Sequence, residues 1–193
     1  MVVYRENILY SEEVVEVSYR SGCFEFNHVV NSVRCVRVFD RGCLGVASSS
    51  RLGFDKLYSI ALKSTSNCRD RVGWFDRDYY SGSVSVGVDR GWDVLYDVVR
   101  SVVDYFSSMG VGCEVVSVYK KLRREHSVVS HSVEAVEDRV LYEVYMYPYT
   151  VFYGRPLSTG LLIGSNNPSR LARVFDEIGE LYNILIGQAR ARQ

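Results

Sequence analysis

The sequence has few of the features that mark a particular chemistry. Basic and acidic residues each number 23, so the formal net charge is +0, which argues against a protein whose main partner is a nucleic-acid backbone. No stretch reaches the roughly 18 uninterrupted apolar residues that a membrane helix needs. Neither GxGxxG nor GxxxxGKS/T occurs, so the usual phosphate-binding loops are missing. These absences predict a soluble, cytoplasmic protein without a membrane partner.

Cysteine pairs at metal-binding or redox spacing are also absent. The five cysteines are odd in number, widely spaced and free of any CxxC, which does not indicate a disulfide framework. Three of them lie within apolar strand patterns, where cysteine is usually a small buried hydrophobe. The sequence therefore predicts reduced, structural thiols. Cys35 and Cys43, on either side of a predicted hairpin, are the only pair close enough to suspect of forming a bond.

Histidine is scarce as well. A helical zinc peptidase needs two histidines one turn apart and a glutamate beside the metal. His126 and His131 are instead five residues apart in a region predicted as strand and turn, so their side chains would point to opposite faces of a regular strand. No metal or other cofactor is predicted. A small, unrecognised enzyme site around these two histidines stays open, with Glu125 and Glu134 joining it if a bulge realigns the strand.

Architecture is what the sequence indicates most clearly. Residues 33–40 alternate with the period of a strand, and Arg41 and Gly42 suit a tight hairpin turn. A second strand-like segment, 43–50, follows, and then a helix-like segment at 54–63. Together with earlier strands predicted at 2–10, 13–19 and 23–26, this order indicates an antiparallel sheet closed by a helix.

The second part of the chain has a similar order. A strand at 83–88 leads to a helix with an apolar stripe, and the predicted members of that stripe are Trp92, Leu95, Val99, Val102, Val103 and Phe106. Three strands at 113–123, 127–136 and 140–149 follow, and a last helix begins at the cap Asn167 and ends near Ala189. The pattern predicts an α+β fold, with a curved, mainly antiparallel sheet and about three helices packed on one side. We expect one domain, 1–193, with two sub-lobes at 1–66 and 82–193 joined by a loop at 67–81.

Basic and aromatic residues provide the candidate binding site. A basic run from Lys120 to Arg124 precedes a group of tyrosines, and such a combination can bind single-stranded nucleic acid through charge and stacking. A solvated strand edge would carry the same charges, and the neutral overall charge makes nucleic acid a partner that we do not expect. The candidate binding residues are Arg123, Arg124, His126, His131, Tyr145 and Tyr147.

Residues 34–62, RCVRVFDRGCLGVASSSRLGFDKLYSIAL, resemble the amino-terminal domain of the TldD/PmbA family, once called modulators of DNA gyrase. That family shows a GVRV, DGR and GFAST pattern before a helix, and the matching segments here are 36–38, 40–42 and 45–49, followed by Leu52. A second resemblance lies at 125–149, where the family has a serine-containing strand, a turn and another strand before a long helix.

The resemblance implies a non-catalytic protein. In the family, a metallopeptidase-like chemistry depends on an HExxxH helix that follows this domain, and this sequence contains no HExxxH, so no catalytic residue can be carried over. Family members pair as dimers that enclose a chamber for peptides. The resemblance therefore implies an interaction or substrate-holding protein, a homodimer or a heterodimer with a TldD/PmbA-type subunit, that acts as partner or regulator and holds extended peptide. A module for single-stranded nucleic acid and a small enzyme remain the alternatives.

Overall fold

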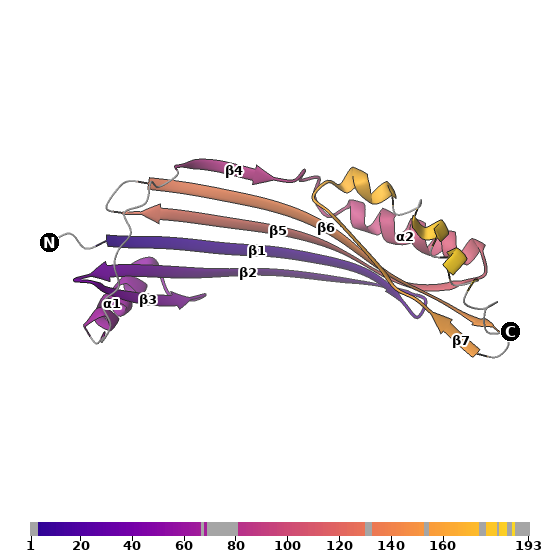
Figure 1. Ribbon diagram of the computed structural model, residues 1–193, viewed down its shortest axis with the longest axis horizontal. Helices are drawn as coiled ribbons and strands as arrows, with labels where there is room; N and C mark the ends of the chain where they lie inside the picture. Colours follow the sequence, from indigo (N-terminus) through magenta and orange to yellow (C-terminus); the bar gives the residue numbers. More distant parts are fainter. Residues whose placement is uncertain are drawn as a thin grey trace. The chain divides into compact units, whose positions relative to one another are not determined.

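The computed structural model describes residues 4–66, 68, 81–129, 133–152, 155–173, 177–180, 182–184 and 187. Its elements, shown in Figure 1, are β1 (Tyr4–Arg20), β2 (Cys23–Asp40), β3 (Cys43–Ser49), α1 (Phe54–Thr65), β4 (Gly82–Val86), α2 (Val94–Ser108), β5 (Gly112–Val128), β6 (Val133–Phe152), β7 (Arg155–Ser158), β8 (Leu161–Ser165) and the 3-10 helix η1 (Pro168–Arg173). The predicted α+β class, a mainly antiparallel sheet with three helices, is confirmed. In the described part of the chain, no helix is both long enough and apolar enough to span a membrane.

The strands form an open sheet in the order β3-β2-β1-β5-β6-β4, and both β7 and β8 also pair with β6. The pairs β2–β3, β6–β7 and β6–β8 are antiparallel. Strand β4 is the exception, because it runs parallel to β6 with Gly82 opposite Ala135 and Val86 opposite Arg139. Parallel neighbours need a long connection, and here the chain passes through α2 and β5 before β6 begins.

The long strands differ from the sequence prediction. Strand β1 is a single strand of 17 residues, whereas two strands were predicted there. Strands β5 and β6 cover the region in which three strands were predicted. The polar segments 124–126 and 137–139, which separate the predicted strands, lie inside β5 and β6. Polar residues do not end a strand when they can face solvent or pair with each other, and ion pairs join several of these residues.

The chain forms two compact units. Unit 1 comprises Met1–Glu12, Val30–Val86 and Leu122–Arg139, and unit 2 comprises Glu13–Val29, Gly87–Lys121 and Val140–Gln193. These differ from the predicted sub-lobes 1–66 and 82–193, because β1, β2, β5 and β6 each contribute residues to both units. Most of the predicted 67–81 connection lies outside the described residues.

Unit 1 contains a small apolar core between α1 and the β2–β3 hairpin. Its buried members are Val36, Val38, Ala47, Leu57 and Ala61. The predicted turn is confirmed, because Arg41 and Gly42 have φ values of 52° and 84° and Asp40 pairs with Cys43, as expected for a two-residue hairpin turn. A Cβ on Gly45 would collide with the carbonyl oxygen of Ala61, so the absence of a side chain there lets α1 approach the sheet.

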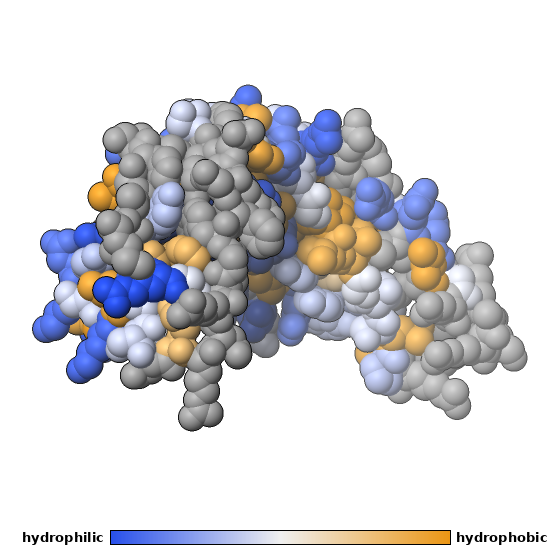
Figure 2. Space-filling view, turned by 60° about the vertical axis from the view of Figure 1, so that its left-hand side comes forward, coloured by the Kyte–Doolittle hydropathy of each residue, from blue (hydrophilic) through white to orange (hydrophobic). Residues whose placement is uncertain are grey.

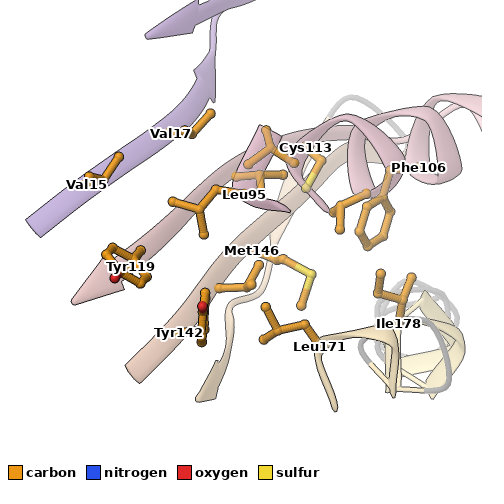
Figure 3. Close-up of a cluster of buried hydrophobic side chains, with 14 of the residues drawn as sticks. Val15, Val17, Leu95, Phe106, Cys113, Tyr119, Tyr142, Met146, Leu171 and Ile178 are labelled. Carbon is orange, nitrogen blue, oxygen red and sulfur yellow. The ribbon is translucent and has the colours of Figure 1, made fainter. Parts of the chain in front are cut away.

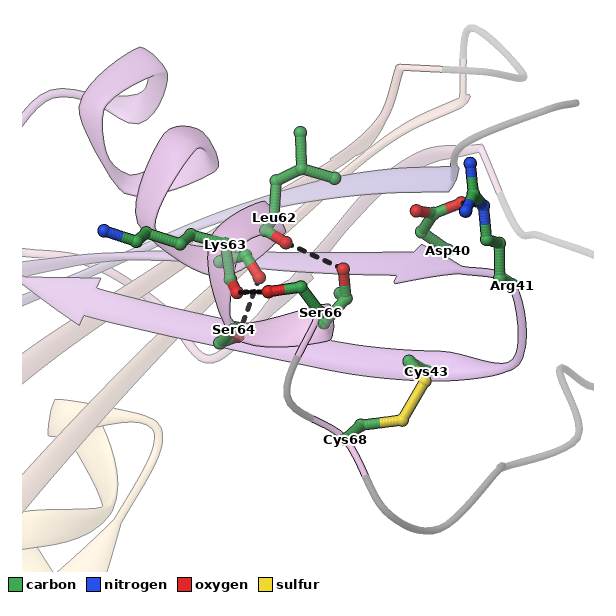
Figure 4. The surroundings of a disulfide bond; sticks show 10 residues. Asp40, Arg41, Cys43, Leu62, Lys63, Ser64, Ser66 and Cys68 are labelled. Carbon is green, nitrogen blue, oxygen red and sulfur yellow. Dashed lines mark hydrogen bonds and ion pairs between the residues drawn. A yellow bond between two sulfur atoms is a disulfide. The ribbon is translucent and has the colours of Figure 1, made fainter.

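A disulfide closes this region. Cys43 bonds to Cys68, which follows α1 (Figure 4), so the prediction that all thiols are reduced is wrong. The suspected partner Cys35 is opposite Ser48 in the hairpin register, whereas Cys43 is opposite Asp40, and this separates the two cysteines along the strands.

Cys23, Cys35 and Cys113 are free. Burial raises the pKa of the Cys113 thiol to about 12, which keeps it protonated and unreactive.

Unit 2 contains a larger apolar core beneath α2 (Figure 3). Four predicted stripe residues, Leu95, Val99, Val102 and Phe106, are fully buried, whereas Trp92 lies before the helix with 39% of its surface exposed. The strands contribute Val15, Val17, Cys113, Val115, Tyr119, Val140, Tyr142, Val144 and Met146. The stripe prediction therefore holds from its second residue onward, except for the half-buried Val103.

The predicted final helix does not begin as an α-helix. Asn167 acts as the expected cap, because its Oδ1 accepts a hydrogen bond from the Ser169 N–H at 3.0 Å, but residues 168–173 form a 3-10 helix. Residues 177–180 are α-helical. Leu171 and Ile178 are buried against the core of unit 2, and the other residues of the predicted helix lie partly outside the described part.

Candidate functional site

The structure divides the predicted binding residues between the two units. Arg123, Arg124 and His126 lie on β5 within unit 1, and Tyr145 and Tyr147 lie on β6 within unit 2. His131 lies outside the described residues. By strand alternation, Arg124 and His126 share one face of β5, while Arg123 lies on the other. The predicted residues are therefore best considered in separate groups.

Most of the basic run is neutralised by nearby carboxylates. Lys120 Nζ lies 2.6 Å from Glu143 Oε2, and Lys121 Nζ lies 2.8 Å from Asp89 Oδ2. Arg123 lies 2.8 Å from Glu125 and 3.5 Å from Asp138. Arg124 is the exception, because it has no ion-pair partner among the described residues. The run thus offers little of the uncompensated positive charge on which nucleic-acid affinity depends.

Asp89 also fixes the segment that leads into α2. Besides Lys121, this carboxylate accepts hydrogen bonds from the Tyr119 hydroxyl at 3.0 Å and the Gly91 N–H at 2.9 Å. The bond from Lys121 is the main reason that the pKa of Asp89 is lowered. Tyr142 adds a buried hydroxyl that accepts a hydrogen bond from the Arg90 N–H at 3.0 Å. These satisfied polar contacts are structural, because they leave no reactive group free.

His126 belongs to a buried polar cluster that the sequence analysis did not identify. The side chain of Glu6 is only 4% exposed, and its Oε2 lies 2.7 Å from Arg37 Nη2 and 3.9 Å from His126 Nε2. Burial raises the pKa of Glu6, but the contact with His126 and the charge of Arg37 outweigh it, so the pKa is lowered from 4.5. Glu6 is therefore an ionised carboxylate held inside unit 1 by positive charge.

This cluster is incompletely hydrogen bonded. Glu6 Oε2, Arg37 Nε and His126 Nε2 are buried and have no hydrogen-bond partner of good geometry among the described residues. Strand alternation could have predicted which face of β1 carries Glu6 and which face of β2 carries Arg37. Only the order of the strands brings the two residues together with His126.

Among the described residues of unit 1, side chains near the predicted ones line two pockets. One, of about 180 Å³, is lined by Asn7, Leu9, Phe54, Glu125, His126, Ser127, Glu134, Ala135 and Val136. The residues suggested for a realigned metal site, Glu125, His126 and Glu134, therefore do share a pocket. However, no group of three or more metal-ligating side chains is close enough to hold an ion in the described part of the chain.

The second pocket, of about 250 Å³, is lined by Tyr10, Leu122, Arg124, Glu137 and Arg139. Its arginines have different environments, since Arg139 Nε donates a hydrogen bond to Glu137 Oε1 at 2.6 Å, whereas Arg124 is unpaired in the described part. This pocket brings Arg124 together with residues that the sequence analysis did not connect to it.

The predicted tyrosines lie on the face of β6 opposite the buried Tyr142, Val144 and Met146. Tyr145 donates a hydrogen bond to Glu143 Oε2 at 3.2 Å, and burial together with that carboxylate raises its pKa. Tyr147 is 47% exposed and lies close to Gly160, where a Cβ would be 3.3 Å from the ring. Tyr147 can contact another molecule, while Tyr145 is already engaged.

An exposed aromatic group in unit 2 was missed by the sequence analysis. Phe24 contacts Tyr96 with ring centroids 4.9 Å apart, and Phe26 contacts Trp92 at 5.3 Å. All four rings remain between 39% and 56% exposed. We call these four residues the aromatic edge. Hydrophobic surface is exposed among hydrophilic residues on the face of the molecule that Figure 2 shows. Alternation of Phe24, Phe26 and His28 was the available sequence signal.

The fold defines the class of the protein: an α+β chain in which helices cover an open, mainly antiparallel sheet. Solved structures with this fold include a proposed modulator of a DNA gyrase from Thermotoga maritima, which matches 86% of the chain with a TM-score of 0.69 and 10% identity. A proposed modulator of DNA gyrase from Bacteroides thetaiotaomicron matches 85% with a TM-score of 0.66 and 13% identity. TldE from Thermococcus kodakarensis matches 84% with a TM-score of 0.59 and 11% identity.

These likenesses confirm the resemblance to the TldD/PmbA family at the level of the fold. The chain spans 40%, 41% and 39% of the three solved chains, a share that fits one domain of each. No protein-family model matches the chain. Among curated proteins, the cargo-transport protein YPP1 of Saccharomyces cerevisiae is 26% identical over 131 residues, which are 63% of this chain and 16% of that protein.

Proposed function

We propose that this chain is a non-catalytic interaction protein that holds extended polypeptide at the free edge of β2. One observation carries the proposal. Strand β2 pairs with β3 only along residues 34–40, and its other neighbour is β1. Within unit 2, residues 23–29 therefore have a strand on one side only, as far as the structure describes the chain.

An unpaired strand edge is chemically suited to polypeptide. Its N–H and C=O groups repeat with the spacing of an extended chain, which can add to the sheet as a further strand. Natural proteins usually protect such an edge with lysine, proline or a bulge, and residues 23–29, CFEFNHV, contain neither lysine nor proline. The aromatic edge includes Phe24 and Phe26 of this segment and provides contact area for alternate side chains of a bound peptide.

The partner is proposed on the likeness in fold. Since the chain covers about 40% of the solved chains that it matches, we propose that it pairs with a second copy or with a TldD/PmbA-type subunit and acts there as a partner or regulator. The single-stranded nucleic-acid alternative has less support, because Lys120, Lys121 and Arg123 are all in ion pairs. The enzyme alternative has less support as well, because no group of three or more metal-ligating side chains gathers around His126 in the described part of the chain.

Binding of an unfolded polypeptide tests the proposal. A reduced and alkylated protein that stays unfolded, labelled with a fluorophore, serves as the probe, and its anisotropy is measured against protein concentration. Phe26→Lys adds a charge to the edge and is expected to weaken binding at least tenfold. Val46→Lys is the matched control, because Val46 is 51% exposed against 56% for Phe26 and lies on a different strand, β3.

Sedimentation velocity tests the partner. A dimer, or a complex with a TldD/PmbA-type subunit, is the expected result. If the wild-type protein binds no unfolded polypeptide and is also monomeric alone and with that subunit, the proposal is wrong. Equal binding by the Phe26→Lys and Val46→Lys variants would instead remove the edge of β2 as the site.

A further inference from the structure

We propose that the pocket formed by Tyr10, Leu122, Arg124, Glu137 and Arg139 binds a small oxyanion, a carboxylate or a phosphate. The pocket belongs entirely to unit 1, whereas the free edge of β2 proposed for polypeptide lies in unit 2. The two proposals therefore depend on different residues and can fail separately.

The charges that line the pocket favour an anion. It contains two arginines and one glutamate, so its lining carries one excess positive charge. Arg139 is engaged by Glu137 through its Nε at 2.6 Å, and the same carboxylate oxygen also contacts its Nη2. Glu137 thus compensates one guanidinium and leaves the other, that of Arg124, without an ion-pair partner in the described part of the chain.

Arg124 differs from the other basic residues of the run in having no ion-pair partner among the described residues. Lys120, Lys121 and Arg123 are each within 2.8 Å of a carboxylate oxygen. A free guanidinium presents parallel N–H donors whose geometry matches the two oxygens of a carboxylate or phosphate. Arg124 also acts on Glu6, since its charge contributes to lowering the pKa of that carboxyl, but no ion pair joins the two among the described residues.

The remaining lining suits a small ligand. A volume of about 250 Å³ exceeds the roughly 30 Å³ that one water occupies in the liquid, so the pocket admits an oxyanion together with a short attached group. Tyr10 is 41% exposed and brings a hydroxyl that can donate a hydrogen bond. Leu122 provides an apolar wall, which suits the side chain beside a peptide C-terminal carboxylate better than it suits a bare anion.

Titration followed by ¹⁵N–¹H NMR tests this proposal on the full chain. The three probes are inorganic phosphate, an N-acetylated uncharged hexapeptide with a free C-terminal carboxylate, and the same hexapeptide with a C-terminal amide, all at one ionic strength. Saturable shifts confined to Tyr10, Leu122, Arg124, Glu137, Arg139 and their neighbours are expected with at least one of the first two probes and not with the amide. Shifts with the free peptide alone identify a carboxylate ligand, and shifts with phosphate alone identify a phosphate ligand.

Neighbouring arginines provide the matched variants. Arg124→Gln is expected to raise the dissociation constant at least tenfold, and Arg124→Lys, which keeps the charge but loses the planar fork, to raise it less. Arg123→Gln changes the adjacent residue on the opposite face of β5 and is expected to leave binding unchanged. Circular dichroism checks that each variant is folded. No saturable shift with either anion, or equal binding by Arg124→Gln and Arg123→Gln, overturns the proposal.

Discussion

The two compact units are stabilised in different ways. In the described part of the chain, the buried apolar cluster of unit 2 has 16 residues, whereas that of unit 1 has five. Unit 1 instead contains the Cys43–Cys68 disulfide and the buried carboxylate of Glu6, which is paired with the partly exposed Arg37. Apolar burial stabilises a fold in proportion to the area removed from water, so unit 2 has a self-sufficient core. Unit 1 depends more on a crosslink and on charge pairing.

Truncation of the core should give the largest effect. Phe106 is fully buried in the cluster of unit 2, and Phe106→Ala is expected to lower the free energy of unfolding by about 3–5 kcal/mol, through lost burial and the cavity left behind. Leu57→Ala, in the smaller cluster of unit 1, is expected to cost less, about 2–3 kcal/mol. Urea denaturation followed by circular dichroism measures both. An equal or larger loss at Leu57 would contradict the comparison.

Loss of the disulfide should follow in size and should act on unit 1. Cys43 and Cys68 are 25 residues apart, and a crosslink over such a loop stabilises by about 3 kcal/mol. A Cys43→Ser, Cys68→Ser double variant is expected to lose that amount in urea denaturation, and Cys113→Ser serves as a thiol control. Mass spectrometry before and after alkylation checks the bond itself. If both thiols are alkylated in the native protein without prior reduction, the bond does not form. That result would agree with the reduced thiols that the sequence analysis predicted.

The buried carboxylate of Glu6 should give the smallest of these effects, and one that depends on pH. Its pKa is lower in the folded protein than the ordinary 4.5, so its ionised form stabilises the fold above the unfolded pKa. This contribution is lost as the pH falls through the folded pKa. Glu6→Gln is expected to lose about 1–3 kcal/mol at neutral pH and to flatten the acid side of the stability profile. Denaturation from pH 3 to 7 measures this, and an unchanged profile would contradict it.

Local pattern was sufficient to predict the parts of the fold that depend on neighbouring residues. The turn at Arg41 and Gly42, the cap at Asn167 and most of the buried stripe of α2 follow from short-range rules. The resemblance to the TldD/PmbA family added the fold class. Strand length could not be predicted in the same way, because Arg124 and Glu137 lie between the predicted strands yet line a pocket from inside long strands.

The features missed by the sequence analysis are those that depend on pairing between distant segments. Glu6 and His126 are 120 positions apart, and they meet only because β1 and β5 are neighbours in the sheet. The partner of Cys43 could not be identified by spacing, since the hairpin places Cys35 at a different register position. The aromatic edge likewise needs α2 beside β2. No pattern within either element alone predicts that contact.

The order of strands also has a consequence for the rate of folding. Strands β1 and β5 are neighbours in the sheet, yet β2, β3, α1, β4 and α2 are all synthesised between them. Pairs this distant along the chain have a high loop-closure cost before any contact repays it, and domains dominated by them fold in milliseconds to seconds. The hairpin of β2 and β3 can form early, whereas the central β1–β5 pair has to wait until β5 has left the ribosome.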